Sequence, residues 1–166
     1  MFVKVRVPAT SANLGPGFDV AGLAVTLYNT FTFELLDEGL EILGCPEQFA
    51  NKDNLAYRAF EEGARYVGLD YKGLRITNEG DVTYTRGLGS SSTCIVAGIV
   101  GAFAFKNRYE ERQNILELAT KIEGHPDNVM PAILGGMVVA SKIEDQYYFQ
   151  ELPLIPFDFV AYIPSY

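Results

Sequence analysis

Gly87–Leu88–Gly89–Ser90–Ser91–Ser92, one residue before the apolar run at 94–105, opens a predicted helix. The run is hydrophobic on every side of a helix, which is typical of a helix buried among other elements. The glycines allow positive φ and the close approach of a ligand to the backbone. The first free amides of the helix carry about +0.5 charge and attract anions. The segment therefore predicts a buried helix whose first turn binds a phosphate.

Two other phosphate-binding loops fit this segment poorly. A Walker A loop ends in Gly-Lys-Ser or Gly-Lys-Thr, and the segment has no lysine. The dinucleotide fingerprint needs a third glycine where Ser92 stands. Serine hydroxyls add hydrogen bonds and can ligate Mg²⁺. The alternative is an ordinary serine-rich helix start with Ser90 as its N-cap.

Helix and strand patterns mix irregularly on both sides of this segment. Apolar residues at helical spacing predict a helix from Asp53, its N-cap, to Val67, with Gly68 as the stop. Another helix is predicted at 110–123, and a short one after His125. Such mixing favours an α+β fold, with residues 1–166 as one domain. The predicted strands are 3–7, 22–28, 30–36, 73–77, 82–85, 137–143, 147–152 and 157–163.

The composition narrows the classes of function. The chain has 166 residues, 48% of them hydrophobic, and a formal net charge of −8. An acidic chain repels phosphate backbones and anionic lipids, so nucleic acid and membrane are poor partners. The apolar run at 94–105 is too short to span a bilayer, and the first residues alternate like a strand rather than a signal peptide. We therefore expect a soluble, cytoplasmic protein that binds an anionic nucleotide only through local groups.

A polar loop follows the first predicted strand. Asn13 and Asp19 flank the turn Gly15–Pro16–Gly17. The turn alone explains the glycines and the proline. A loop that brings an amide and a carboxylate together also suits a ligand with an ammonium and a hydroxyl group, and loops commonly carry binding residues.

The segment Glu123–Gly124–His125–Pro126–Asp127–Asn128 contains the only histidine of the chain. It lacks the histidine or cysteine pairs of a zinc site. Asp127 can simply cap the next helix. Successive helical side chains point about 100° apart, so only one of Asp127 and Asn128 can face a given substrate atom. A polar segment between two apolar elements favours the lining of a site.

Three segments together resemble the GHMP kinases, and homoserine kinases in particular. The GHMP loop Pro-x-x-x-Gly-Leu-Gly-Ser-Ser-x is similar to Thr83–Tyr84–Thr85–Arg86–Gly87–Leu88–Gly89–Ser90–Ser91–Ser92. Homoserine kinases resemble this chain at Val7–Pro8–Ala9–Thr10–Ser11–Ala12–Asn13–Leu14–Gly15–Pro16–Gly17–Phe18–Asp19 and at 123–128, in the same order. Thr83 stands where the pattern has proline, so the loop entrance lacks the fixed φ that proline would give.

The resemblance implies ATP-dependent phosphorylation of the L-homoserine hydroxyl to O-phosphohomoserine, on the route to threonine. It implies a ribosomal-protein-like two-layer fold with a left-handed βαβ crossover, a hand that is rare in general. ATP and Mg²⁺ are the implied cofactors. The residues placed on the nucleotide are Arg86, Gly87, Leu88, Gly89, Ser90, Ser91 and Ser92, and those placed on Mg²⁺ are Ser91 and Glu117.

The same resemblance places four residues on homoserine, namely Asn13, Asp19, His125 and Asn128, with Asp19 facing its ammonium group. Mevalonate-type kinases have an aspartate base where this chain has Asn128, and an asparagine cannot take up a proton. Asn128 and Asp127 are the catalytic candidates, with Asp127 as the alternative base. Phosphoryl transfer can proceed by positioning and charge stabilisation, so a protein base is dispensable.

The family pattern continues into a second domain, whose first strand residues 157–166 can form. That domain supplies the arginines that grip the substrate carboxylate. We therefore expect this chain by itself, without a C-terminal domain, to be inactive or very weak, and its uncovered surface to favour a homodimer. Two alternatives stay open, another GHMP small-molecule kinase and a non-catalytic nucleotide-binding module.

Overall fold

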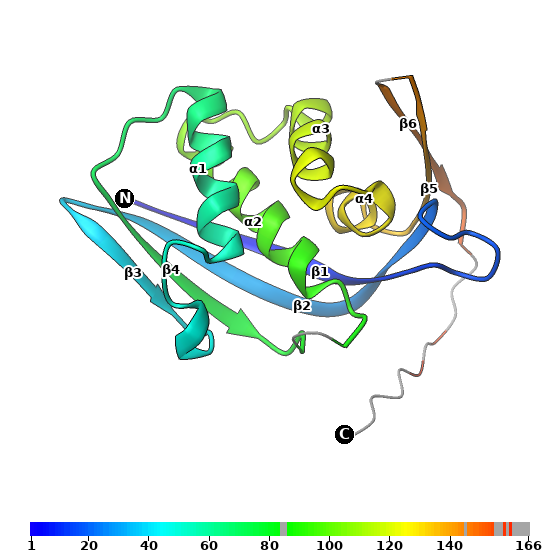
Figure 1. Ribbon diagram of the computed structural model, residues 1–166, viewed down its shortest axis with the longest axis horizontal. Coiled ribbons are helices and arrows are strands. Elements are labelled where there is room, and N and C mark those ends of the chain that lie inside the picture. Colours follow the sequence, from blue (N-terminus) through cyan, green and yellow to red (C-terminus); the bar gives the residue numbers. More distant parts are fainter. Residues whose placement is uncertain (84–85, 145, 155–157, 159, 161–166) are drawn as a thin grey trace.

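The computed structural model describes residues 1–83, 86–144, 146–154, 158 and 160. These residues form two layers, a six-stranded sheet with four α-helices on one face (Figure 1). Buried Val5 and Val7 alternate with exposed Lys4 and Arg6 along the first strand, because successive side chains of a strand point to opposite faces. The predicted α+β class is confirmed.

The long strand β2 (Ala21–Leu36) organises the sheet. β1 (Phe2–Ala12) lies antiparallel along one edge of it. On the other edge, the second half of β2 pairs with β4 (Gly73–Gly80), and its first residues pair with β5 (Met137–Ile143), both antiparallel. Residues 24–28 of β2 belong to neither ladder, so the sheet has a break between β4 and β5 at this point.

Two shorter strands complete the sheet. β3 (Gly39–Leu43) lies parallel to β4, and β6 (Gln146–Leu152) lies antiparallel to β5. The connection from β3 to β4 contains a 3₁₀ turn, Glu47–Phe49, and helix α1 (Leu55–Val67). Two parallel neighbours joined by a helix form the βαβ unit that the resemblance implies, and its left hand stays a prediction.

Some predicted strands differ from the observed ones. β2 is continuous where two strands were expected at 22–28 and 30–36, because Asn29 is buried within the sheet rather than in a turn. β1 continues through residues 9–12, past a bulge at Pro8 and Ala9, where a loop was expected. Of the strand expected at 82–85, residues 82 and 83 lie outside any strand, and the rest falls outside the described residues. The sequence pattern did not reveal β3.

The helices end where local chemistry stops them. Asn54, not Asp53, caps α1, and its Oδ1 accepts hydrogen bonds from the amides of Ala56 and Tyr57. Gly68 ends α1 as predicted, with φ of 64°. The other helices are α2 (Ser90–Phe105), α3 (Arg112–Glu123) and α4 (Pro126–Leu134).

Helix α2 is the centre of the core, as its apolar sequence predicts. A Cβ atom on Gly98 would lie 2.7 Å from the backbone nitrogen of Phe60 in α1. A Cβ atom on Gly101 would lie 2.7 Å from the Phe33 ring of β2. Phe33 and Phe60 stack at 5.2 Å between ring centroids, and each buried ring contributes about 2 kcal/mol to stability. These close contacts fix the second half of α2 against α1 and β2.

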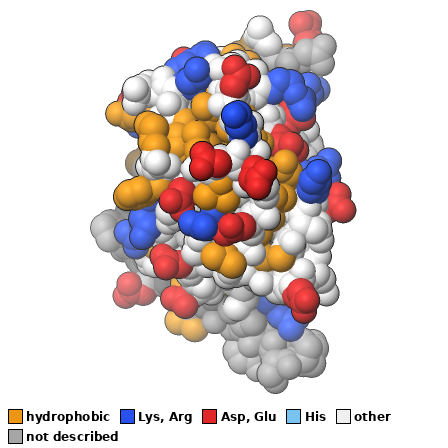
Figure 2. All heavy atoms as spheres, turned by 90° about the vertical axis from the view of Figure 1, so that its left-hand side faces the viewer, with side chains coloured by type: hydrophobic (Ala, Val, Ile, Leu, Met, Phe, Trp, Pro, Cys, Tyr) orange, Lys and Arg blue, Asp and Glu red, His pale blue; other side chains and the backbone are white. Residues whose placement is uncertain are grey.

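The surface shows mixed charge. Acidic, basic and hydrophobic side chains intermingle on the face in Figure 2, and they form no continuous basic surface there. Within the described residues, every helix is too short or too polar to cross a lipid bilayer. The strand predicted at 157–163 falls mostly outside the described residues, so the domain limits 1–166 stay a prediction.

Candidate functional site

The glycine–serine loop enters α2 with its backbone open. Gly87 and Gly89 both have positive φ, 71° and 64°, and Gly89 rather than Ser90 is the N-cap. No side chain caps the helix, and a Cβ atom on Gly87 would meet nothing within 4 Å. The first amides of a helix have no partner within it. The loop therefore offers free N–H groups at the positive end of a buried helix, the arrangement that an anion prefers.

Asn29 holds both ends of this loop. Its Oδ1 accepts from the amide of Val82 at 3.2 Å, and its Nδ2 donates to Thr93 Oγ1 at 3.1 Å. Asn29 is 2% exposed, so both bonds lie inside the protein, where a polar group needs partners. The Thr93 hydroxyl in turn donates to the Ser90 carbonyl at 2.8 Å. The loop is thus tied to β2 before and after its open part.

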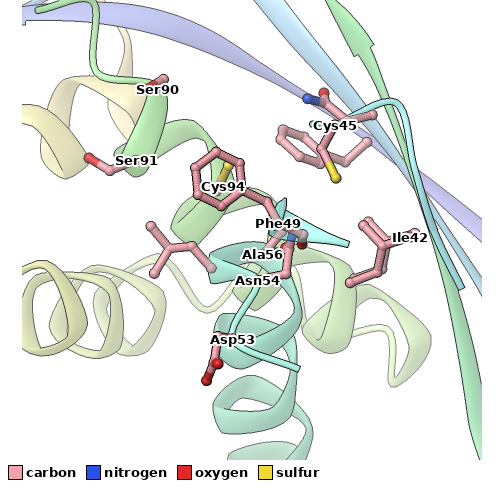
Figure 3. Close-up of a pocket in the computed structure, with 13 residues that line it drawn as sticks. Ile42, Cys45, Phe49, Asp53, Asn54, Ala56, Ser90, Ser91 and Cys94 are labelled. Atoms are coloured by element: carbon pink, nitrogen blue, oxygen red, sulfur yellow. Dashed lines mark hydrogen bonds between the residues drawn. The ribbon is translucent and has the colours of Figure 1, made fainter. Parts of the chain in front are cut away.

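A cavity of about 350 Å³ lies beside the start of α2 (Figure 3). Ser90 and Ser91 stand at one end of it, and Asn54 from the start of α1 contributes an amide. Burial raises the pKa of Cys94 to about 12, so this thiol stays protonated and acts as apolar wall. The apolar lining consists of Phe31, Ile42, Cys45, Phe49, Leu55, Ala56, Ile76 and Cys94. A flat aromatic group with a few polar atoms fits such a lining.

Glu123, the last residue of α3, reaches the same helix start. Its Oε1 accepts from the hydroxyl of Ser91 at 2.7 Å and from that of Ser92 at 3.1 Å. Glu117 is exposed and accepts instead from Gln113, 2.8 Å away. Glu123 lies six positions after Glu117, about 9 Å along the helix axis. The structure therefore favours Glu123 over Glu117 as the carboxylate near Ser91.

The histidine segment forms a hydrogen-bonded group at the start of α4. His125 Nδ1 bonds Asp127 Oδ1, which also accepts from Asn128 Nδ2 at 3.4 Å. Asp127 is 1% exposed, whereas the His125 side chain is partly open. Burial alone would lower the pKa of His125, but the bond to Asp127 and the charges of Asp127, Glu123 and Asp19 outweigh it and raise that pKa. Protonated His125 is thus stabilised by surrounding carboxylates.

The loop at 13–20 carries backbone strain on its two predicted ligands. Asn13 and Asp19 have positive φ, 59° and 55°, and the Asp19 amide donates to Asn13 Oδ1 at 3.0 Å. Positive φ is uncommon outside glycine, although asparagine and aspartate tolerate it best. Both side chains are exposed. The loop leads into β2, where Gly22 packs against the backbone of Asp127. The charge of Asp19 also contributes to raising the pKa of His125.

The family that this chain matches is consistent with the open helix start, the cavity and the Ser91–Glu123 contact described above. Residues 54–136, half of the chain, match the model of the GHMP kinases N terminal domain. The chain belongs to the GHMP kinases. The matched part of this GHMP kinase chain includes the capping Asn54, the glycine–serine loop, Glu123 and the histidine segment.

Individual relatives of this GHMP kinase chain agree with the family. Homoserine kinase of Clostridium beijerinckii is 48% identical over 99% of this chain and 56% of that protein. Homoserine kinase of Lactobacillus gasseri is also 48% identical, over the same shares. The solved homoserine kinase of Cytophaga hutchinsonii superposes with a TM-score of 0.77 at 27% identity, over 93% of this chain and 52% of that one. The chain thus spans about half the length of the curated relatives it matches.

The sequence motifs missed three residues that this GHMP kinase chain brings into the site. Thr10 lay inside the segment 7–19 that resembles homoserine kinases, but no role was assigned to it, and Asn29 fell between the strands expected at 22–28 and 30–36. Glu123 was visible as the residue two places before His125, but linear spacing favoured Glu117. Arg86 is exposed at the loop entrance. The backbone carbonyl of Leu88 accepts a hydrogen bond from the Thr10 amide.

Proposed function

We propose that this chain is the nucleotide-binding part of a cytoplasmic homoserine kinase, which transfers the terminal phosphoryl group of ATP to the hydroxyl of L-homoserine. The product is O-phosphohomoserine, on the route to threonine. One observation carries the proposal, the meeting of the Ser91–Glu123 pair with an open helix start and an adjoining cavity. The identity to homoserine kinases along nearly the whole chain supports the choice of substrate.

The cavity binds the base of the nucleotide, and the glycine–serine loop binds its phosphates. The apolar walls suit the base, and Ser90 and Ser91 at one end of the cavity lead to the helix start. The segment Arg86–Gly87–Leu88–Gly89–Ser90–Ser91–Ser92 then binds the phosphates through its amides and hydroxyls. Exposed Arg86 adds one positive charge to a chain of net charge −8. Local groups, rather than the overall charge, therefore account for the binding of a polyanion.

The oxygen atoms around Ser91 suit Mg²⁺. This ion prefers one or two carboxylates and hydroxyls and completes its shell with phosphate oxygens and water. Ser91 Oγ and Glu123 Oε1, already 2.7 Å apart, would hold it at the phosphate side of the cavity. When bound, it supplies charge neutralisation for phosphoryl transfer. We assign this role to Ser91 and Glu123, in place of the expected Glu117.

The polar groups on the other side of Gly89 bind the acceptor. Asp19 and Asn13 suit the ammonium group of homoserine, and His125 and Asn128 contact its other polar atoms. Asp127 is buried and its Oδ1 is bonded to both His125 and Asn128, so it orients them rather than meeting the substrate. Transfer then relies on positioning and charge stabilisation rather than on a protein base.

Because this chain covers only about half the length of its relatives, a second function is also a candidate. A GHMP kinase half that retains the cavity and loop can act as a nucleotide-binding module without turnover. Another acceptor alcohol would make it a different GHMP kinase. These outcomes differ in whether ADP is released and with which acceptor.

The test compares two proteins. One is this chain, and the other is the chain fused to the part of the Clostridium beijerinckii relative that lies beyond the match. Thermal melting with ATP–Mg²⁺ shows binding in each. Homoserine-dependent ADP release by the fusion, absent with mevalonate, supports the proposal. A folded fusion that binds ATP–Mg²⁺ but releases no ADP with homoserine contradicts it and supports the binding module, whereas release only with another alcohol supports a different GHMP kinase.

A further inference from the structure

Thr10 lies between the two halves of the proposed site. It is fully buried at the far end of β1. Its amide donates to the carbonyl of Leu88 at 3.1 Å, and its hydroxyl donates to Asn128 Oδ1 at 2.8 Å. A single residue of the first strand thus contacts both the glycine–serine loop and the substrate-side segment, although 118 positions separate it from Asn128.

We propose that Thr10 is a positioning residue. Its hydroxyl fixes the Asn128 amide so that Nδ2 faces the acceptor alcohol. Its side chain sets how close Gly89 comes to that amide. This proposal rests on the proposed function, because only that function makes an alcohol the group that Nδ2 faces. The hydrogen bonds of Thr10 with Leu88 and Asn128 do not depend on that function.

The hydrogen bonds around Asn128 determine which way its amide points. Oδ1 accepts from Thr10, and Nδ2 faces Asp127 Oδ1 at 3.4 Å, a long contact that leaves an N–H free for another acceptor. Turning the amide around would set Oδ1 against the oxygen of Asp127, which also bonds His125. Two acceptors facing each other repel. Asn128 therefore presents an N–H donor to an alcohol oxygen, where it can hold the attacking atom without removing its proton.

Thr10 also determines how close the phosphate loop comes to that amide. A Cβ atom on Gly89 would overlap Thr10 Oγ1 and would lie 3.3 Å from Asn128 Oδ1. The space that a side chain at position 89 would need is thus filled by the threonine hydroxyl. The phosphate-binding turn and the alcohol-binding amide thus both lie against this one hydroxyl. Their separation is the quantity on which in-line phosphoryl transfer depends.

The hydroxyl of Thr10, rather than its bulk, carries this role. Valine has nearly the same shape but no donor, so Thr10→Val keeps the packing and leaves Asn128 Oδ1 unpaired in a part-buried site. Serine keeps the donor and loses only a methyl group. Comparing the two variants therefore separates positioning from packing.

The kinetic test uses the fusion protein described above. We expect Thr10→Val to lower kcat about tenfold, the effect of one lost hydrogen bond, with the KM for ATP within about threefold. Thr10→Ser should keep kcat within about threefold of the wild type. Equal kcat in Thr10→Val and wild type overturns the proposal, and so does an equal loss in both variants, since that reports packing. If Thr10→Val melts much earlier than the wild type, Thr10→Ala takes its place.

A second readout needs no turnover. The side-chain amide signals of Asn128 in the 166-residue chain, assigned by their loss in Asn128→Asp, should shift in Thr10→Val and stay in place in Thr10→Ser. Unchanged signals in Thr10→Val overturn the positioning role. If these shifts appear but no fusion protein phosphorylates homoserine, the assigned function fails and the Thr10–Asn128 contact stands.

Discussion

Gly89→Ala and Gly87→Ala form a matched pair that tests how the phosphate loop is packed. Both glycines have positive φ, so each alanine adds backbone strain of about 1 kcal/mol. Only at position 89 does the new methyl group meet protein, overlapping Thr10 Oγ1 and lying 3.2 Å from Thr10 Cβ. Thr10 is buried and cannot move aside, so overpacking adds about 1–3 kcal/mol more.

The free energy of unfolding from urea titrations followed by circular dichroism measures both variants. We expect Gly87→Ala to lose about 1 kcal/mol, and Gly89→Ala to lose about 2–4 kcal/mol. The double variant Thr10→Ala with Gly89→Ala should recover part of the second loss, because the overlapping hydroxyl is gone. Equal losses in the two single variants, or no recovery in the double variant, would refute the packing argument.

Three further predictions concern the groups around the loop. Glu123→Gln should weaken ATP binding by about tenfold in Mg²⁺ but not in EDTA, measured by calorimetry, whereas the control Glu117→Gln should leave both unchanged. Asn29→Ala should lower the free energy of unfolding by about 2–4 kcal/mol in urea titrations, since it unpairs Val82 and Thr93 inside the protein. The folded-state pKa of His125 is raised above 6.5, so its stabilisation is complete below that pH and is lost as pH rises through the folded-state value. The wild type should therefore lose more stability than His125→Gln between about pH 6 and pH 9, and parallel pH profiles would contradict this.

Local patterns predicted the parts of the fold that local interactions determine. The apolar run after the glycine–serine loop gave the buried helix α2, and Gly68 marked the end of α1. Asn29 misled the strand prediction, because a polar residue within an alternating run suggests a turn unless its buried partners are known. β3 escaped notice since its residues are only partly buried or exposed, and its apolar signal is correspondingly weak.

The candidate site was predictable only in its motifs. The glycine–serine loop and the histidine segment were visible because each is a short run of unusual residues. The choice between Glu117 and Glu123 depends on how α3 meets α2, which linear spacing does not encode. Thr10 takes its importance from partners far along the chain, and a threonine in a strand carries no such signal by itself.

The break between the β4 and β5 ladders on β2 bears on how this protein folds. Contacts between residues distant in sequence form slowly, because a long loop must close before they stabilise anything. Across β2 from this break, Thr10 of β1 pairs with Ala24 and also bonds Leu88 and Asn128. We therefore expect the junction of β1, the glycine–serine loop and α4 to form only after most of the chain has collapsed. We expect native-state hydrogen exchange to show this junction opening before the α1–α2 core. This junction would then be the last part of the described structure to assemble and the first to come apart.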